Sequence, residues 1–137
     1  MGLVVDSGVL YATLDRKDRH HAACVKLLDG AQEVRVVPAP VLPEIDWLCR
    51  HTPHGRFGVV LAQIENGAIE IEELERSDYL RVAELLKTYA DLRVGFVDAA
   101  VLAVVERLRE PKLATLDHRH FTVMRPRHVK ALELLPA

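Results

Sequence analysis

The sequence has little cysteine and no long apolar run. Its 137 residues contain two cysteines, Cys24 and Cys49, which form no C-x-x-C pair and fall within helical patterns. This usage is typical of small buried side chains in a reducing compartment and speaks against a disulfide framework. No apolar run approaches the ~20 residues needed to cross a bilayer, and no basic segment precedes the apolar residues 3–5, as it would in a signal peptide. We therefore expect a cytoplasmic protein without a membrane partner.

The sequence also lacks a large excess of charge of one sign, and it has no repeat, linker or low-complexity segment. The formal net charge is −2 at pH 7, which argues against a sequence-independent coat protein for nucleic acids. Half of the residues are hydrophobic and 28% are charged, as in folded globular proteins. At this length we expect one domain, spanning residues 1–137, with a buried core.

Short apolar strands alternate with helices along the whole chain. Strands are predicted at residues 3–5, 33–37, 68–72, 111–117 and 131–135, with a further short strand at 123–124. Helices are predicted at about residues 9–14, 21–28, 41–51, 57–64, 77–90 and 98–105, with a turn at 52–55 and a loop or single helical turn at 118–121. Ser77 is predicted to cap its helix. The buried face of that helix is predicted to consist of Tyr79, Val82, Ala83, Leu85, Leu86 and Tyr89. This alternation predicts an α/β fold with a central, mostly parallel sheet and helices on both faces.

Residues 95–105 form a strongly apolar stretch in which Asp98 is the single carboxylate. The run of alanine, valine and leucine predicts a helix that is buried on most of its faces. A buried carboxylate without a partner is unstable, so Asp98 requires a compensating group. Two interpretations are open at this point: Asp98 caps the amino end of the helix, or it binds a cation together with other acids.

Three further acids stand at comparable positions. Asp6 and Asp117 end predicted strands, and Glu44 lies near the start of a helix. Helix capping, shared with Ser7, is an equally simple role for Asp6. The carboxyl ends of parallel strands meet in one crevice, where several carboxylates repel one another unless a divalent cation neutralises them. An all-oxygen set suits Mg²⁺ or Mn²⁺, and such ions promote phosphodiester hydrolysis.

Four short segments carry a family resemblance. The segments at residues 3–7 (LVVDS), 43–45 (PEI), 95–100 (GFVDAA) and 114–121 (ATLDHRHF) resemble, in order, the motifs of the PIN domain. They are most similar to those of the VapC-type toxins of bacterial toxin–antitoxin pairs, and the resemblance extends over essentially the whole chain. It implies a PIN-like fold and an endoribonuclease that uses Mg²⁺, with Mn²⁺ as an alternative, to hydrolyse RNA phosphodiester bonds.

The resemblance also implies roles for individual residues. The catalytic and metal-binding acids would be Asp6, Glu44, Asp98 and Asp117. The hydroxyl groups of Ser7 and Thr115 would support them, and Asp117 would be less essential because it acts in part through water. The resemblance further implies a homodimer that is inhibited by a cognate antitoxin.

Two histidines flank Asp117, and a His-x-His pair can bind a metal ion. No cysteine or further histidine has the spacing of a zinc ligand relative to His118 and His120, so a zinc site is not expected. We interpret these histidines as solvated side chains or as groups that face phosphate.

Charge is distributed unevenly along the chain. Residues 112–130 contain five basic residues and one acid, a net charge of +4. Residues 63–84 contain seven acids and two basic residues, a net charge of −5, and should not meet RNA. The basic segment is either a solvated surface or a contact with the RNA backbone through Arg119, Arg125 and Arg127.

Trp47 lies off the apolar stripe of its predicted helix. It either packs against a neighbouring helix or belongs to an interface, where tryptophan is enriched at hot spots. The resemblance to VapC-type toxins favours the interface, because this family buries an apolar groove under an antitoxin segment. Tyr11, Cys24 and Leu28 are candidates to line the same groove, and an antitoxin arginine would pair with the acids.

A different class of function remains open from the residues alone. An α/β chain can be a binding module without catalysis, and phosphoacceptor domains that resemble response-regulator receivers also cluster acids at strand ends. Receivers need a lysine after a late strand, whereas residues 115–117 offer an acid there and Lys112 comes too early. Metal binding distinguishes these classes, because a bound ion stabilises the native state.

Overall fold

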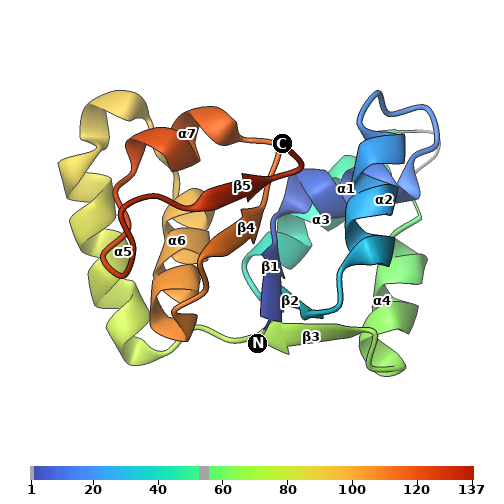
Figure 1. The fold of residues 1–137 in the computed structure, drawn as a ribbon, viewed down its shortest axis with the longest axis horizontal. Helices are drawn as coiled ribbons and strands as arrows, with labels where there is room; N and C mark the ends of the chain where they lie inside the picture. Colours follow the sequence, from blue (N-terminus) through green and yellow to red (C-terminus); the bar gives the residue numbers. More distant parts are fainter. Residues whose placement is uncertain (1, 53–55) are drawn as a thin grey trace.

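The described chain forms a central sheet in which all strands run parallel. The computed structural model describes residues 2–52 and 56–137, so most of the turn predicted at 52–55 lies outside it. Within the described residues the strands are β1 (Gly2–Val5), β2 (Val34–Pro38), β3 (Ile69–Glu72), β4 (Lys112–Ala114) and β5 (Glu133–Leu135). Their order across the sheet is β3-β2-β1-β4-β5, and each neighbouring pair is parallel (Figure 1). The predicted α/β class is confirmed.

Strand β1 lies at the centre of the sheet and joins the two halves of the chain. Val4 pairs with Val36 of β2 on one side and with Leu113 of β4 on the other. Leu3, Val4 and Val5 are almost completely buried, because helices cover both faces of the sheet. The last strand, β5, lies at an edge of the sheet, as predicted.

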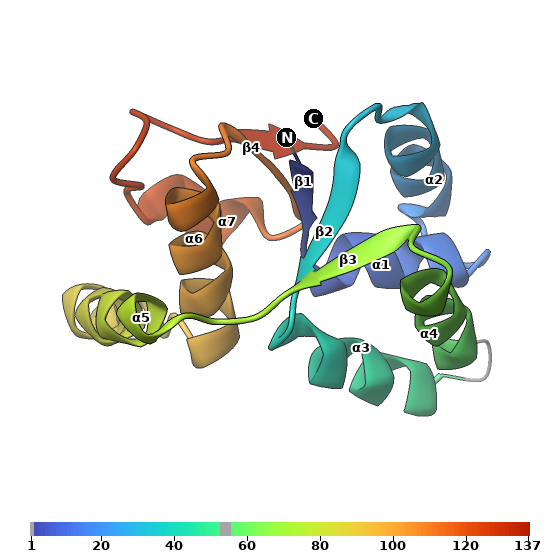
Figure 2. The ribbon, with the colours of Figure 1, turned by 90° about the horizontal axis from the view of Figure 1, so that it is seen from below.

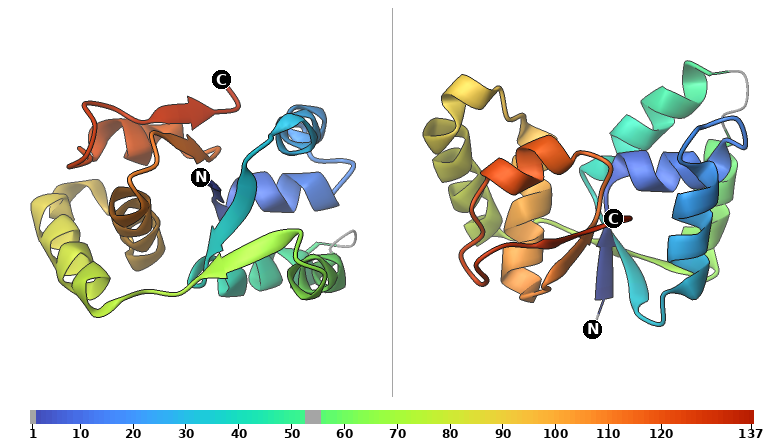
Figure 3. Two further views of the ribbon diagram at one scale, coloured as in Figure 1. Left: turned by 60° about the horizontal axis from the view of Figure 1, so that its bottom comes forward. Right: turned by 45° about the horizontal axis from the view of Figure 1, so that its top comes forward.

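The helices form a layer on each face of the sheet. One layer contains α1 (Ser7–Leu14), α2 (His21–Gly30), α3 (Val41–Arg50) and α4 (Phe57–Glu65) (Figure 2). The opposite layer contains α5 (Arg76–Thr88), α6 (Phe96–Leu108) and α7 (His118–Val123), as Figure 3 also shows. A 3₁₀ turn, η1 (Ala90–Leu92), connects α5 to α6. Among the described helices, none combines the length and apolar character needed to cross a membrane.

Helix α5 begins earlier than predicted, and its buried face agrees with the prediction in part, since Val82 and Leu85 are buried as expected. Its cap is Glu75 and not Ser77, because Glu75 and Asp78 each accept a hydrogen bond from the other's backbone N–H in a capping box. Tyr79 and Ala83, which were expected to be buried, are exposed. The buried positions of α5 are Asp78, Val82 and Leu85. The buried Asp78 has a cationic partner on α6.

The short strand predicted at residues 123–124 is wrong. Helix α7 continues to Val123, and Met124 follows it outside any strand. The Asp117 side chain accepts a hydrogen bond from the backbone N–H of His120 and so caps the helix. Met124 is 1% exposed, so its side chain fills the core below α7 and its backbone does not pair with the sheet.

The partner of Asp78 is Arg107, near the end of α6. The Arg107 Nε lies 3.0 Å from a carboxylate oxygen of Asp78, and Nη1 lies 2.9 Å from one of Glu72. Nη2 also donates to the backbone carbonyl of Glu73 at 3.1 Å. The Asp78 side chain is 4% exposed, so this carboxylate depends on Arg107 for its charge balance. The network fastens α6 to the start of α5 and to the end of β3.

Replacing Arg107 by methionine is expected to destabilise the fold by about 3 kcal/mol, because it leaves the Asp78 carboxylate buried without a cation. Urea unfolding followed by circular dichroism measures this loss. Arg50→Met is the matched control, since Arg50 pairs with Asp46 on the surface at 3.2 Å. We expect a cost of at most about 1 kcal/mol for that variant. Equal losses in the two variants would contradict the role of Arg107.

Candidate active site

A cleft of about 550 Å³ opens where β1 and β4 end and α6 begins. Its walls are formed by Asp6, Ser7, Gly8, Glu44, Asp98, Leu116 and Asp117. The four acids that the sequence singles out therefore lie together, although they are far apart along the chain. The parallel sheet brings them together, because the carboxyl ends of neighbouring strands meet at one edge.

Asp6 follows β1 directly and forms the floor of the cleft. Its carboxylate accepts hydrogen bonds from the backbone N–H of Ser7 at 2.8 Å and from the hydroxyl of Thr115 at 2.9 Å. The first of these bonds caps α1, so the predicted capping role of Asp6 is present. Capping does not remove Asp6 from the cleft, so the cap is compatible with a second role in binding a cation.

The pKa of Asp6 is raised from its ordinary value to about 6. Burial is the main cause, since the residue is only 5% exposed and the charged form loses hydration. The hydrogen bonds from Ser7 and Thr115 oppose the rise, whereas the negative charges of Asp98 and Glu44 add to it. A buried acid surrounded by other acids is a position at which a cation would be strongly stabilised.

Glu44 reaches the cleft from the first turn of α3. Its carboxylate accepts a hydrogen bond of 2.9 Å from the hydroxyl of Ser7, so Ser7 links two of the predicted acids. The nearby Asp46 instead pairs with Arg50, one helical turn further along α3. Of these two acids on α3, Glu44 is the one that lines the cleft.

Asp98 is the third residue of α6 and does not cap it. The cap position is Gly95, and no side chain accepts a capping hydrogen bond there, so the capping interpretation of Asp98 is wrong. Its carboxylate instead lies 2.9 Å from Nδ1 of His120. Burial and the neighbouring charge of Asp117 raise the pKa of Asp98, and His120 partly offsets that rise.

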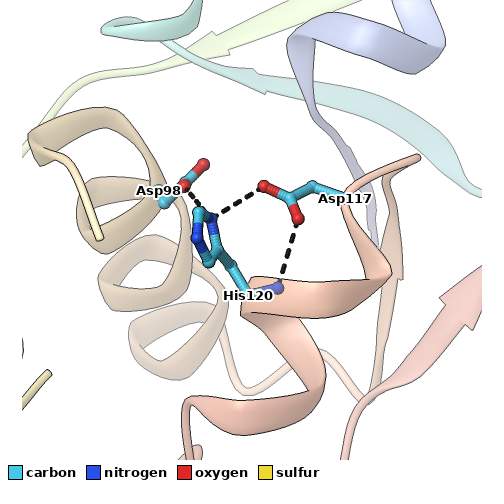
Figure 4. Close-up of side chains that lie close together, drawn as sticks. All are labelled: Asp98, Asp117 and His120. Carbon is cyan, nitrogen blue, oxygen red and sulfur yellow. Dashed lines mark hydrogen bonds and ion pairs between the residues drawn. The ribbon is translucent and has the colours of Figure 1, made fainter. Parts of the chain in front are cut away.

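His120 places its imidazole ring between two of the acids (Figure 4). Nδ1 lies 2.9 Å from an oxygen of Asp98 and 2.9 Å from an oxygen of Asp117. These three ligand atoms lie within 4.8 Å of one another. Burial lowers the pKa of His120, but the charges of Asp117 and Asp98 outweigh that effect and raise it. The geometry is that of a small site with two oxygen donors and one nitrogen donor.

The interpretation of the two histidines as solvated groups holds for His118 and is wrong for His120, while a phosphate-facing role stays a prediction for both. His118 is exposed, with Nε2 at 3.1 Å from the backbone carbonyl of Thr115. The signal for His120 was its spacing, because residues three apart on a helix share one face. Once Asp117 starts α7, His120 must lie beside it. The acids and this ring form a candidate metal site whose oxygen-rich donors suit a divalent cation such as Mg²⁺ or Mn²⁺.

The basic residues predicted to meet RNA differ in their surroundings. Arg119 lines a hollow of about 400 Å³ together with Arg93 and His120, which places it beside the acidic site. Arg127 forms an ion pair with Glu84, so its charge is already balanced. Arg125 is exposed and lines a different hollow, next to α7.

Trp47 is 53% exposed and stacks on His51 of its own helix, with ring centroids 4.1 Å apart. It lines an apolar pocket of about 410 Å³ with Ser7, Glu44 and Leu48, so this pocket adjoins the acidic cleft. The other residues predicted for this groove do not belong to it, because they are buried in the core. They are Tyr11, Cys24 and Leu28.

Known proteins resemble this chain in sequence and in fold. The PIN domain family matches residues 3–125. Ribonuclease VapC26 of Mycobacterium tuberculosis is 31% identical over 129 residues, which cover 90% of this chain and 93% of the relative. The solved structure of VapC20 of Mycobacterium tuberculosis, a Sarcin-Ricin loop cleaving toxin, has a TM-score of 0.74 at 22% identity, over 86% of this chain and 92% of that one. VapBC2 of Rickettsia felis, bound to a DNA fragment from its promoter, has a TM-score of 0.67 at 13% identity, over 98% and 97% of the two chains.

Replacing Asp6 by asparagine is expected to stabilise the metal-free protein at pH 8 by about 2 kcal/mol. The pKa of Asp6 is raised from 3.8 to about 6, so folding favours the protonated acid and stability is lost as the pH rises through about 6. Asparagine removes the charge, keeps one oxygen that accepts the backbone N–H of Ser7, and can donate its NH2 to the hydroxyl oxygen of Thr115. Urea unfolding in a chelator, at pH 8 and at pH 5, should show the gain shrinking at the lower pH. A gain that does not change with pH, or a loss at pH 8, would contradict this account.

Proposed function

The chain belongs to the PIN domain family, and from this premise we propose that it is a metal-dependent endoribonuclease toxin held inactive by an antitoxin. One observation carries the proposal: the four predicted acids line a single cleft. The ribonuclease VapC26, which resembles the chain over nearly its full length, supports the same reaction class.

We propose that Asp6, Glu44 and Asp98 hold Mg²⁺ or Mn²⁺, with Asp117 assisting. The fit rests on this chain's own chemistry, because these acids repel one another and burial raises the pKa of Asp6 and Asp98. When bound, such an ion supplies positive charge for the phosphate and activates water. Hydrolysis then adds water across the bond between phosphorus and the 3′ oxygen. The products are a 5′-phosphate and a 3′-hydroxyl, so the RNA 2′-hydroxyl is not the nucleophile.

The neighbouring hydroxyl groups act by positioning these acids. Thr115 donates to Asp6 and also accepts the backbone N–H of Asp117 at 3.0 Å, so one side chain fixes acids on two segments. Ser7 donates to Glu44. Carboxylates that are already held in position lose less conformational freedom when they bind a metal ion, which favours binding. The exposed Arg119, beside the cleft, supplies a positive charge for the RNA backbone.

The alternative of a receiver-like phosphoacceptor gains no support from the cleft. Receivers need a lysine near their clustered acids, and among the described residues no lysine lines this cleft. A binding module without catalysis would not require several acids that oppose one another's ionisation, as Asp6 and Asp98 do. The hydrolytic function therefore accounts for more of the observed arrangement.

Replacing Asp98 by asparagine is expected to lower the rate of RNA cleavage about a hundredfold or more, because it removes a metal-binding charge without changing the size of the side chain. Cleavage of total RNA with Mg²⁺, with capture of new 5′-phosphate ends, measures this effect. Asp46→Asn is the matched control, since Asp46 lies on α3 outside the cleft and pairs with Arg50. We expect wild-type cleavage for the control, and wild-type cleavage by Asp98→Asn would overturn the assignment.

We further propose that the antitoxin covers Trp47 with an apolar helix and directs an arginine toward the acids, and that the toxin is a homodimer. The exposed Trp47 and the apolar pocket that adjoins the cleft support this arrangement. Solved structures of similar fold include a toxin–antitoxin complex from Klebsiella pneumoniae, with a TM-score of 0.66 at 14% identity over 90% of this chain and 92% of that one. The pocket shares Ser7 and Glu44 with the cleft, so a segment bound in it would also block access to the acids.

Replacing Trp47 by alanine is expected to weaken the affinity for the copurified antitoxin by more than about 1 kcal/mol, or about fivefold. Calorimetry measures the affinity, light scattering the mass of the dimer, and circular dichroism the fold. Tyr79→Ala is the control, because Tyr79 is 55% exposed on α5, in the opposite helical layer. A smaller loss for Trp47→Ala than for the control would remove Trp47 from the interface.

A further inference from the structure

The ring of His120 reaches the acidic site from α7, a helix that contains none of the four predicted acids. Its Nδ1 faces carboxylate oxygens of Asp98 and Asp117 at 2.9 Å each (Figure 4). Adjacent ligands of an octahedral ion with bonds of ~2.1 Å stand about 3.0 Å apart. The spacing from the ring nitrogen to each oxygen is that of a hydrogen bond and is also close to one edge of such a coordination shell.

The local backbone holds His120 in this position. Asp117 caps α7 by accepting the backbone N–H of His120 at 3.1 Å, and its own N–H donates to Thr115 at 3.0 Å. One carboxylate thus fixes the helix start with one oxygen and faces the imidazole with the other. The ring and the two acids are consequently arranged before any ion arrives, which favours binding.

We propose that Nδ1 of His120 is a direct ligand of the divalent ion, together with the carboxylates of Asp98 and Asp117. The inference rests on the metal binding put forward in the proposed function, and it adds a nitrogen to a set composed of oxygen. Mg²⁺ prefers oxygen ligands, whereas Mn²⁺ accepts imidazole more readily. The ring therefore shifts the selectivity of the site from Mg²⁺ toward Mn²⁺.

A competing arrangement makes the opposite prediction. His120 could balance the charge of the two acids only in the metal-free protein and leave them when the ion binds. In that case the bound ion would have oxygen neighbours alone. The identity of the atoms next to the ion separates the two arrangements, and Mn²⁺ reports it directly, because its electron spin couples to a coordinated ¹⁴N nucleus.

The experiment titrates the full chain with Mn²⁺ alone, without RNA. Calorimetry gives the Mn²⁺ and Mg²⁺ affinities, and pulsed electron paramagnetic resonance detects the ¹⁴N coupling. His120→Asn sets an amide oxygen near the place of Nδ1 and keeps the backbone bonds of α7. His118→Asn is the matched control, because His118 lies two residues away on the same helix and is exposed. His120→Gln serves as a second variant, and circular dichroism verifies the fold of each.

We expect ¹⁴N coupling in the wild type and in His118→Asn, and its loss in both His120 variants. The Mn²⁺ affinity should fall about tenfold in His120→Asn, with a smaller change for Mg²⁺. Mn²⁺ binding without ¹⁴N coupling in the wild type, or coupling that persists in the His120 variants, would overturn the ligand role and leave the metal-dependent function standing. Failure of the wild type to bind either ion would overturn both.

Discussion

The gathering of negative charge at the carboxyl ends of β1 and β4 is the constraint on which the structure of the cleft depends. Asp6 is buried there, and the charges of Asp98 and Glu44 oppose its ionisation. The surrounding polar groups, among them Thr115 and His120, donate hydrogen bonds to these acids. These donors hold the carboxylates in place without balancing all of their charge. The fold therefore maintains a permanent attraction for cations at one edge of the sheet.

Asp78, a buried acid outside the cleft, has its charge balanced by an arginine. Asp78 is even less exposed than the acids of the cleft, yet Arg107 satisfies it with a close ion pair. That guanidinium also engages Glu72 and a backbone carbonyl, so the charges at this junction are balanced within the fold. Asp78 therefore contributes to the packing of the helices, whereas the acids of the cleft keep negative charge that a ligand could balance. Burial alone does not distinguish them; the presence of a full cationic partner does.

The fold and the meeting of the four acids could be predicted, because both follow from short-range pattern. Strands alternate with helices, and the acids stand after strands or in the first turns of helices. The position of His120 was missed, because its spacing of three residues from Asp117 points inward only once Asp117 is known to cap the helix. Tyr11 was misassigned to a groove because an apolar residue on a helix has the same pattern whether it faces the core or a partner. Ser77 failed as a cap because Glu75 and Asp78 form a capping box that starts α5 two residues earlier.

The pairing of β1 with β4 joins Val4 to Leu113, which lie far apart in the sequence. A ribosome therefore releases Asp6 and Glu44 long before it releases Asp98 and Asp117, and a partly synthesised chain holds only half of the acidic set. Throughout that interval the edge of β1 that later pairs with β4 has no neighbouring strand, and exposed strand edges can pair with other chains. The order of synthesis thus postpones a complete cleft until Asp117 has been made, and one edge of β1 stays uncovered until β4 can pair with it.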